Sequence, residues 1–278
     1  MTSAISAIGQ QTMSSSTQSR NVNTMHTYDF RTRAGSVARR AAVLAVFVAT
    51  SLVGSAGSAA QAQAPAASKT GAAVVNPDPA RLVAEIRAFR AWDEKNAVPR
   101  DGVLFLGSSS IRLWNTGTAF PGVPVINRGF GGAHISDVNY YLSDVAQMYE
   151  PAVVVFYGGD NDIGDGKGRD QVLADYNAFV SRMLTSRRNT QVVLMAIKPS
   201  LQRWAQWPLM REVNEALKTF SATDERLHFA DIATPMLGAD GKPRPEMFVA
   251  DGLHMTPAGY AAWNKVLGPM LEKIRSGK

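Results

Sequence analysis

The segment VLFLGSSSI, residues 103–111, joins a short apolar run to a glycine and three serines. The apolar run, residues 103–106, does not alternate in polarity and is too short for a helix, which is typical of a strand buried on both faces of a sheet. Four later runs have the same character and cover residues 123–126, 153–157, 192–197 and 227–232. The sequence therefore predicts five buried strands, the pattern of a parallel sheet.

Helical patterns alternate with these strands. Leu82, Ile86 and Phe89 recur at helical spacing and predict a helix over residues 78–96. Thr256 and Pro257 are typical of a helix cap and a first helical residue. The four later helices are predicted over residues 136–149, 169–185, 209–221 and 257–274. Right-handed crossovers between parallel strands then give an α/β fold, a three-layer α/β/α domain with a five-stranded parallel sheet.

The first sixty residues have the arrangement of an export signal. A basic stretch, residues 31–40, precedes an apolar run, residues 41–53, and then small residues. The apolar run is shorter than the roughly 20 residues that span a membrane. Ala60-Gln61-Ala62 predicts cleavage after Ala62, and a retained signal anchor is the alternative. We therefore expect a secretory signal region (1–62), a linker (63–77) and one folded domain (78–278), secreted or periplasmic, with no stable membrane span after cleavage.

Composition narrows the choice of partners and chemistry. The formal net charge is +6, but much of the surplus comes from the five arginines among the first 62 residues. Because no basic stripe with interleaved aromatic residues follows, we expect no nucleic-acid partner. The chain has no cysteine, which excludes disulfides, thiolate nucleophiles and cysteine metal ligands.

Glycines and small polar residues follow three of the predicted strands and precede the last helix. In open α/β sheets, ligands bind outside the carboxyl ends of the strands, where such clusters come together. A hydrophobic core needs no polar residues there. The four clusters are GSSS at 107–110, NRGFGG at 127–132, GGDND at 158–162 and DGLH at 251–254.

These clusters contain the groups needed for nucleophilic acyl transfer. A serine hydroxyl such as that of Ser109 needs a base to take its proton, and His254 is the natural candidate. Asp251, three residues earlier, can fix the tautomer of that histidine. The backbone N–H of Gly132, the side-chain amide of Asn161 and the N–H of Ser109 itself could stabilise the oxyanion of the intermediate.

With these blocks in this order, the chain resembles the SGNH or GDSL-type hydrolases over about residues 103–275. The family takes its name from Ser, Gly, Asn and His, one from each of four blocks, here FLGSSSI (105–111), NRGFGG, GGDND and DGLH. The resemblance implies a flavodoxin-like sheet, esterase or lipase activity through an acyl-enzyme, and no cofactor or metal. It places Ser109 as nucleophile, Asp251 and His254 as its triad partners, and Gly132 and Asn161 in the oxyanion hole.

The chain departs from the family pattern at two positions. Ser108 replaces the aspartate before the nucleophile, and Ala133 stands where an aspartate often follows the oxyanion glycine. The motif G-x-S-x-G of the larger α/β-hydrolase family is absent, because Ile111 occupies its last glycine position. Ser108 and Ser110 are the rival nucleophiles within the first block.

The sequence predicts an extracytoplasmic hydrolase of carboxylic esters, with short acyl groups favoured because no long apolar lid is evident. Candidate substrate contacts follow the strand ends: Arg112, Trp114, Lys198 and Trp204. Two alternatives remain at this stage. One is an acyltransferase with the same triad, and the other is a non-catalytic envelope- or carbohydrate-binding protein of the same fold. The natural ester and the oligomeric state cannot be predicted from the sequence.

Overall fold

The computed structural model describes residues 73–277. The predicted signal region, 1–62, and most of the predicted linker, 63–77, therefore lie outside the described residues. The described part contains one sheet of five parallel strands in the spatial order β2-β1-β3-β4-β5. The strands are β1 (Val103–Gly107), β2 (Val125–Gly129), β3 (Val153–Tyr157), β4 (Gln191–Met195) and β5 (Leu227–Ala230).

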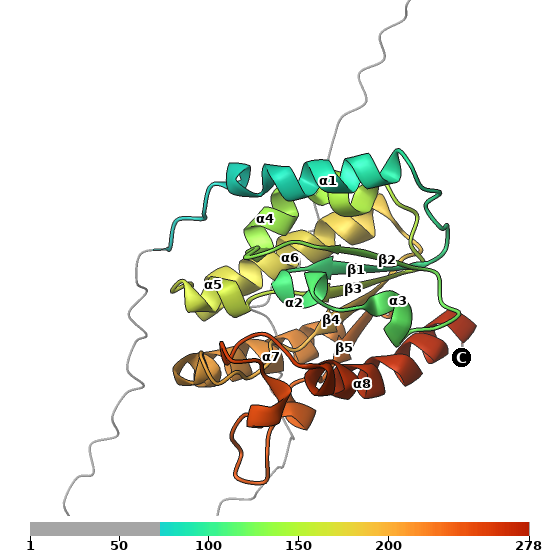
Figure 1. Ribbon diagram of the computed structural model, residues 1–278. Helices are drawn as coiled ribbons and strands as arrows, with labels where there is room; N and C mark the ends of the chain where they lie inside the picture. Colours follow the sequence, from blue (N-terminus) through green and yellow to red (C-terminus); the bar gives the residue numbers. More distant parts are fainter. Residues whose placement is uncertain (1–72, 278) are drawn as a thin grey trace, which may run out of the picture.

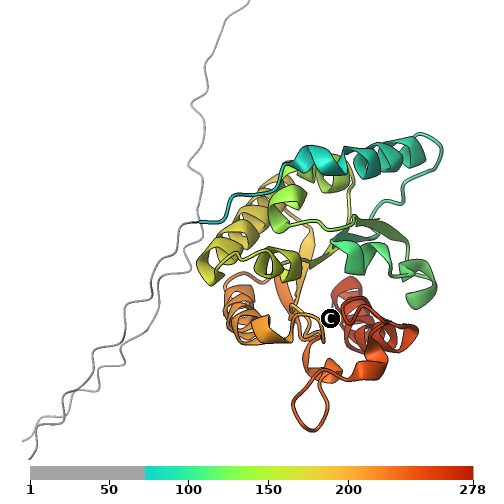
Figure 2. The ribbon, with the colours of Figure 1, turned by 60° about the vertical axis from the view of Figure 1, so that its left-hand side comes forward.

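Helices cover both faces of the sheet, and Figure 2 shows the resulting three layers. One face carries α1 (Val83–Asp93), α4 (Ile135–Tyr140), α6 (Arg169–Ser186) and α7 (Trp207–Ser221). The other face carries α2 (Ser109–Arg112), α3 (Thr116–Ala119) and α8 (Pro257–Ser276), which are labelled in Figure 1. The predicted three-layer fold is thus confirmed, including its five-stranded parallel sheet.

The burial of each strand depends on its place in the sheet. Every residue of β1 and β3 is buried, because these strands have neighbours on both sides and helices on both faces. The edge strands β2 and β5 each contain two partly exposed residues besides their buried ones. Trp263 of α8 is fully buried and packs on Tyr157 and Trp114, so it fixes α8 against the centre of the sheet.

The predicted helix over residues 136–149 is divided in the structure. It consists of α4 and a separate π-helical turn, η2 (Ser143–Gln147). Val138, Leu142 and Val145 are buried on either side of the break, so the apolar spacing continues across it. Periodicity alone could not reveal the interruption, because the side chains that face the core keep their spacing.

Single-turn helices are the elements that the sequence pattern missed. These are α2, α3 and α5 (Asp160–Gly164), together with the 3-10 turns η3 (Trp204–Gln206), η4 (Thr234–Met236) and η5 (Pro245–Met247). The predicted helix over residues 78–96 is present as the 3-10 turn η1 (Pro79–Leu82) followed by α1. Three to five residues are too few for a period of 3.6 to be seen. Two of these turns begin directly after strands β1 and β3, where the candidate site residues lie.

None of the helices in residues 73–277 combines the length and the apolar character that crossing a membrane requires.

Candidate active site

The turn from β1 into α2 singles out one of the three serines. Gly107 ends the strand with a φ of 144°, a conformation that favours glycine. Ser108 and Ser110 are buried, at 1% and 2% exposure, whereas Ser109 at the start of α2 is partly exposed. Of the candidate nucleophiles, Ser109 is therefore the one that a substrate can reach.

A hydrogen-bonded chain joins Ser109 to two residues that are distant in sequence. Oγ of Ser109 lies 2.9 Å from Nε2 of His254, and Nδ1 of that ring lies 2.6 Å from Oδ2 of Asp251. Because Asp251 accepts at Nδ1, Nε2 is left as the acceptor that can take the serine proton. This geometry is that of a nucleophile, a base and a carboxylate that orients the base.

Asp251 is held in its ionised form by its surroundings. Its Oδ1 accepts from the backbone N–H groups of Leu253 and His254, at 2.8 and 2.9 Å. Burial is the largest single influence and raises its pKa, but the hydrogen bonds from the His254 ring and from these two N–H groups together outweigh it and lower the pKa to about 2. The carboxylate therefore stays charged through the neutral pH range.

The loop that carries this pair is fixed on both sides. Gly252 has a φ of 66°, and the Val249 N–H donates to the His254 carbonyl at 2.9 Å. Directly after the loop, Thr256 caps α8 by accepting from the Gly259 N–H, and Pro257 is the first helical residue. The predicted start of the last helix is confirmed, and this helix start anchors the loop that places His254.

The candidate oxyanion donors come from the loops after β2 and β3. Gly132, with a φ of 65°, has open space where a Cβ atom would lie, and its N–H has no partner among the described residues. Nδ2 of Asn161, in α5, donates one hydrogen to the Ala133 carbonyl at 3.0 Å, and this leaves its second hydrogen for another acceptor. The loop and α5 are thus tied to each other beside these donors.

The N-terminal helical segment holds the loop that carries Gly132. Arg81 donates to both oxygens of Asp137, at 2.7 and 2.6 Å, and to the carbonyl of Gly132 at 3.2 Å. Glu85 accepts from the N–H of Gly131 at 3.0 Å. Arg81 and Glu85 are four residues apart, the spacing of an ordinary surface pair on a helix. The sequence therefore gave no sign that they act on a loop some fifty residues away.

A buried ion pair supports the same loop from below. Asp162 is fully buried and accepts from the Ile135 N–H at 3.2 Å, so this aspartate braces the loop. Nζ of Lys167 lies 2.8 Å from Asp162 and 2.7 Å from Asp175. Burial alone would lower the pKa of Lys167, but the two carboxylates outweigh it and raise the pKa. Lys167 is thus the counter-charge for Asp162.

The predicted substrate contact Lys198 is wrong. Its side chain is fully buried, and its Nζ lies 2.9 Å from Oδ2 of Asp160 and 3.3 Å from the hydroxyl of Tyr157. A buried carboxylate needs a counter-charge, and Lys198 supplies it. The ammonium is therefore not available to a ligand.

Of the other three predicted contacts, Arg112 and Trp204 reach the surface, whereas Trp114 is almost completely buried. Arg112 is about half exposed, and its guanidinium lies over Gly131 and pairs with Glu85 at 3.4 Å. Trp114 is nearly buried and donates to Asn264 at 3.1 Å, yet it also lines a concavity of about 410 Å³ between α3 and the start of α8.

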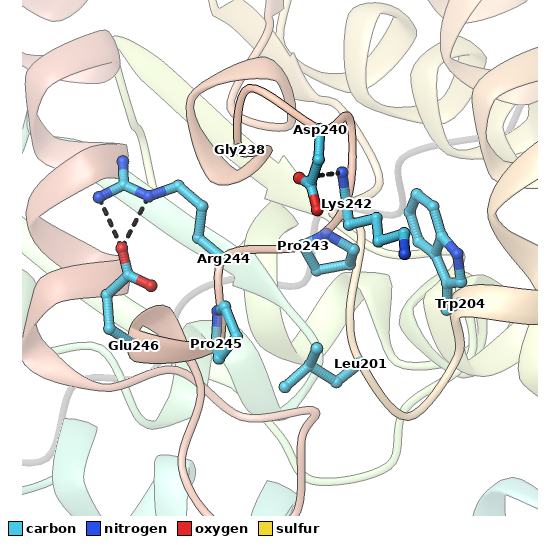
Figure 3. A pocket seen from close by; sticks show the side chains of 9 residues that line it. All are labelled: Leu201, Trp204, Gly238, Asp240, Lys242, Pro243, Arg244, Pro245 and Glu246. Atoms are coloured by element: carbon cyan, nitrogen blue, oxygen red, sulfur yellow. Dashed lines mark hydrogen bonds and ion pairs between the residues drawn. The ribbon is translucent and has the colours of Figure 1, made fainter.

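Trp204 lines a second concavity, of about 340 Å³, beside the loop that carries His254. Figure 3 shows Trp204 and Leu201 on one side and residues 238–246 on the other, with Arg244 paired to Glu246. The backbone of the Gly252 turn adjoins this wall, because the Gln202 N–H donates to the Gly252 carbonyl at 3.0 Å. The lining is mixed in character: Leu201, Trp204, Gly238, Asp240, Lys242, Pro243, Arg244, Pro245 and Glu246.

Comparison with known proteins gives the family. The model of the GDSL-like lipase/acylhydrolase family matches residues 112–262, more than half of the chain. The chain belongs to this family. The matched segment contains Gly132, Asn161, Asp251 and His254, and it begins just after Ser109. The resemblance identified from the four sequence blocks is thereby confirmed. As a GDSL-like acylhydrolase, the protein belongs to the hydrolases. No curated protein matches the chain.

Solved structures with the same fold support the architecture of this GDSL-like acylhydrolase. A candidate acylhydrolase from Bacteroides fragilis has a TM-score of 0.59 and 21% identity, over 72% of this chain and 100% of that one. A GDSL-like lipase from Bacteroides thetaiotaomicron has a TM-score of 0.59 and 18% identity, over 68% and 97%. At these identities the similarity establishes the fold.

Removal of the buried ammonium under the loop should destabilise the acylhydrolase. Lys167→Met leaves Asp162 as an uncompensated buried charge, so we expect a loss of about 3–5 kcal/mol in the free energy of unfolding. Urea denaturation measures this loss. Lys265→Met, at an exposed position of α8, is the matched control and should cost less than about 0.5 kcal/mol. Equal losses for the two variants would contradict the account of Lys167 as a necessary counter-charge.

Proposed function

We propose that this GDSL-like acylhydrolase cleaves carboxylic esters through an acyl-enzyme on Ser109. The observation that supports the proposal most is the chain of hydrogen bonds from Ser109 through His254 to Asp251, 2.9 and 2.6 Å long. Asp251 and His254 meet the serine across about 145 residues of sequence, at the edge where the strands end. Packing alone gives no reason for these three polar side chains to form such a chain on a partly exposed surface.

The proposed reaction has two halves. Oγ of Ser109 attacks the ester carbonyl carbon while Nε2 of His254 takes the hydroxyl proton, and the carbonyl oxygen becomes an oxyanion. The N–H of Gly132 and the free amide hydrogen of Asn161 donate to that oxygen. When the intermediate collapses, the bond to the alcohol breaks and His254 returns the proton to the leaving oxygen. Water, deprotonated by His254, then attacks the acyl-serine and releases the acid.

The nucleophile can be tested directly. We expect a fluorophosphonate to label the protein once, on Ser109, because only a serine paired with a base reacts readily. Ser109→Ala should lose nearly all ester turnover and all labelling, with an unchanged melting temperature. Ser108→Ala and Ser110→Ala are matched controls, since both side chains are buried, and both should keep label and turnover. Turnover by folded Ser109→Ala would overturn the proposal.

We further propose short acyl groups on polar alcohols as the substrates. The concavity beside the His254 loop is lined by charged side chains as well as by Leu201 and Trp204, which suits a polar alcohol better than a long acyl chain. Proteins with the same fold include an acetyl esterase (TM-score 0.52, 19% identity) and an acetyl-xylooligosaccharide esterase from Geobacillus (TM-score 0.51, 15% identity). Acetylated saccharides are therefore the first natural esters to assay.

A series of p-nitrophenyl esters isolates the acyl group, because the leaving alcohol is constant. We expect kcat/KM to fall at least about tenfold from acetyl to octanoyl. Ser109→Ala supplies the background rate for each ester. A kcat/KM that rises with chain length would reject the preference for short acyl groups, while leaving the serine mechanism in place.

We propose that the protein is exported and cleaved after Ala62. The proposal rests on the basic, apolar and small-residue segments before that position. When the full chain is expressed in a bacterial host, mass spectrometry of protein recovered from the periplasm or the medium should find an N-terminus at Gln63. An intact N-terminus in the membrane fraction would instead show a retained signal anchor.

A further inference from the structure

Arg203 approaches Asn161 from the side opposite the Ala133 carbonyl contact. It lies in the connection between β4 and α7, and its side chain is mostly buried, at 16% exposure. Its Nη2 donates to Oδ1 of Asn161 at 3.0 Å, and its Nη1 lies 3.5 Å from Oδ2 of Asp160. Asp160 and Asn161 are the first two residues of α5, so one guanidinium contacts both.

This contact decides which way the amide of Asn161 faces. A guanidinium has donors and no acceptor, so only the oxygen of the amide can face Arg203. The NH₂ group is then directed to the other side, where one hydrogen binds the Ala133 carbonyl at 3.0 Å. If the amide were reversed, two donor groups would face each other at Arg203 and the Ala133 carbonyl would face an oxygen. Arg203 therefore fixes the orientation that leaves the second amide hydrogen free.

The position of the guanidinium is itself built into the fold. Lys198 neutralises Asp160 at 2.9 Å, so the aspartate stays paired whether or not Arg203 is present. A Cβ atom on Gly164, the last residue of α5, would lie 2.7 Å from Nε and 3.0 Å from Cζ of Arg203. The guanidinium thus occupies the space that a side chain at position 164 would fill, and this space exists because the residue is a glycine.

We propose that Arg203 is a positioning residue of the oxyanion hole. Its hydrogen bond orients the amide of Asn161, and its positive charge polarises that amide, which makes the free N–H a stronger donor to the developing oxyanion. Arg203 does not contact the substrate. The inference rests on the proposed function through the role of Asn161, and its test must separate the two.

The first measurement divides the effect on kcat from the effect on KM. Arg203→Ala should lower kcat about tenfold, since the amide still reaches the site but is less well held, and should change KM by less than about twofold. Arg203→Lys keeps the positive charge but lacks the planar, forked guanidinium. Its kcat should lie between that of Arg203→Ala and that of the unchanged protein. Arg100→Ala is the control, because Arg100 pairs with Glu150 on the surface before β1 and should leave kcat unchanged. A raised KM with an unchanged kcat would show a substrate contact and overturn the inference.

A double-mutant cycle tests whether the effect passes through Asn161. Asn161→Ala alone should lower kcat about a hundredfold. In that background, Arg203→Ala should change kcat by less than about twofold, because the amide it positions is gone. A tenfold loss in both backgrounds would overturn the inference and leave the serine mechanism standing. A wild-type kcat for Asn161→Ala would also overturn the inference. The proposed function is tested independently, by the turnover of Ser109→Ala.

Gly164→Ala is a second way to remove the guanidinium from Asn161, and it leaves Arg203 itself unchanged. The added methyl would meet the flexible end of the Arg203 side chain, so the guanidinium can move aside without loss of the fold. We expect a several-fold lower kcat, an unchanged KM and no further loss when Gly164→Ala is added to Arg203→Ala. Circular dichroism and a thermal melt confirm folding for each variant. An unchanged kcat for Gly164→Ala, with a crystal structure that shows the guanidinium displaced, would overturn the inference.

Discussion

At the end of β1, the backbone of Gly107 lies so close to Tyr157 in the central strand, β3, that a Cβ atom would sit 1.9 Å from the Tyr157 carbonyl oxygen. The strand therefore has to end in a residue without a side chain, and the φ of 144° turns the chain away from the sheet. The next residue, Ser108, occupies the N-cap position of α2, and Ser109 becomes the first helical residue. The exposure of Ser109, and with it the approach of His254, follows from this close contact between two strands.

The polar groups around the site are arranged in two tiers. Gly132, His254 and Ser109 are exposed or partly exposed at the sheet edge, and Asn161 lies just beneath them at 8% exposure. Beneath them, ion pairs between buried groups hold the loops: Lys167 with Asp162, and Lys198 with Asp160. Burying such charges is costly, and a well-packed apolar replacement is often as stable. Their value here lies in orientation, because Asp160 and Asp162 are the two neighbours of Asn161, a candidate oxyanion donor.

Other residues support the loop at the position where the second block lacks the aspartate of the family pattern. Ala133 makes no polar side-chain contact, and the loop is fixed instead by Arg81 and Glu85 from the N-terminal helical segment and by Asp162 from α5. The N-terminal segment is thereby part of the site, although none of its side chains has been assigned to the chemistry. In this chain, the support of the loop that carries Gly132 therefore comes from a more distant part of the sequence.

The sequence by itself determined the five strands, their parallel arrangement and the four polar clusters at one edge, because burial on both faces and glycine-rich strand ends leave local patterns. It also singled out Ser109, Asp251 and His254, whose meeting follows from the topology of a parallel sheet. Only the tertiary structure showed the single-turn helices, the division of the helix over residues 136–149 and the burial of Lys198. It alone showed the contacts of Arg81 with Gly132 and of Arg203 with Asn161, because a hydrogen bond between residues 51 or 42 positions apart leaves no periodic trace in a single sequence.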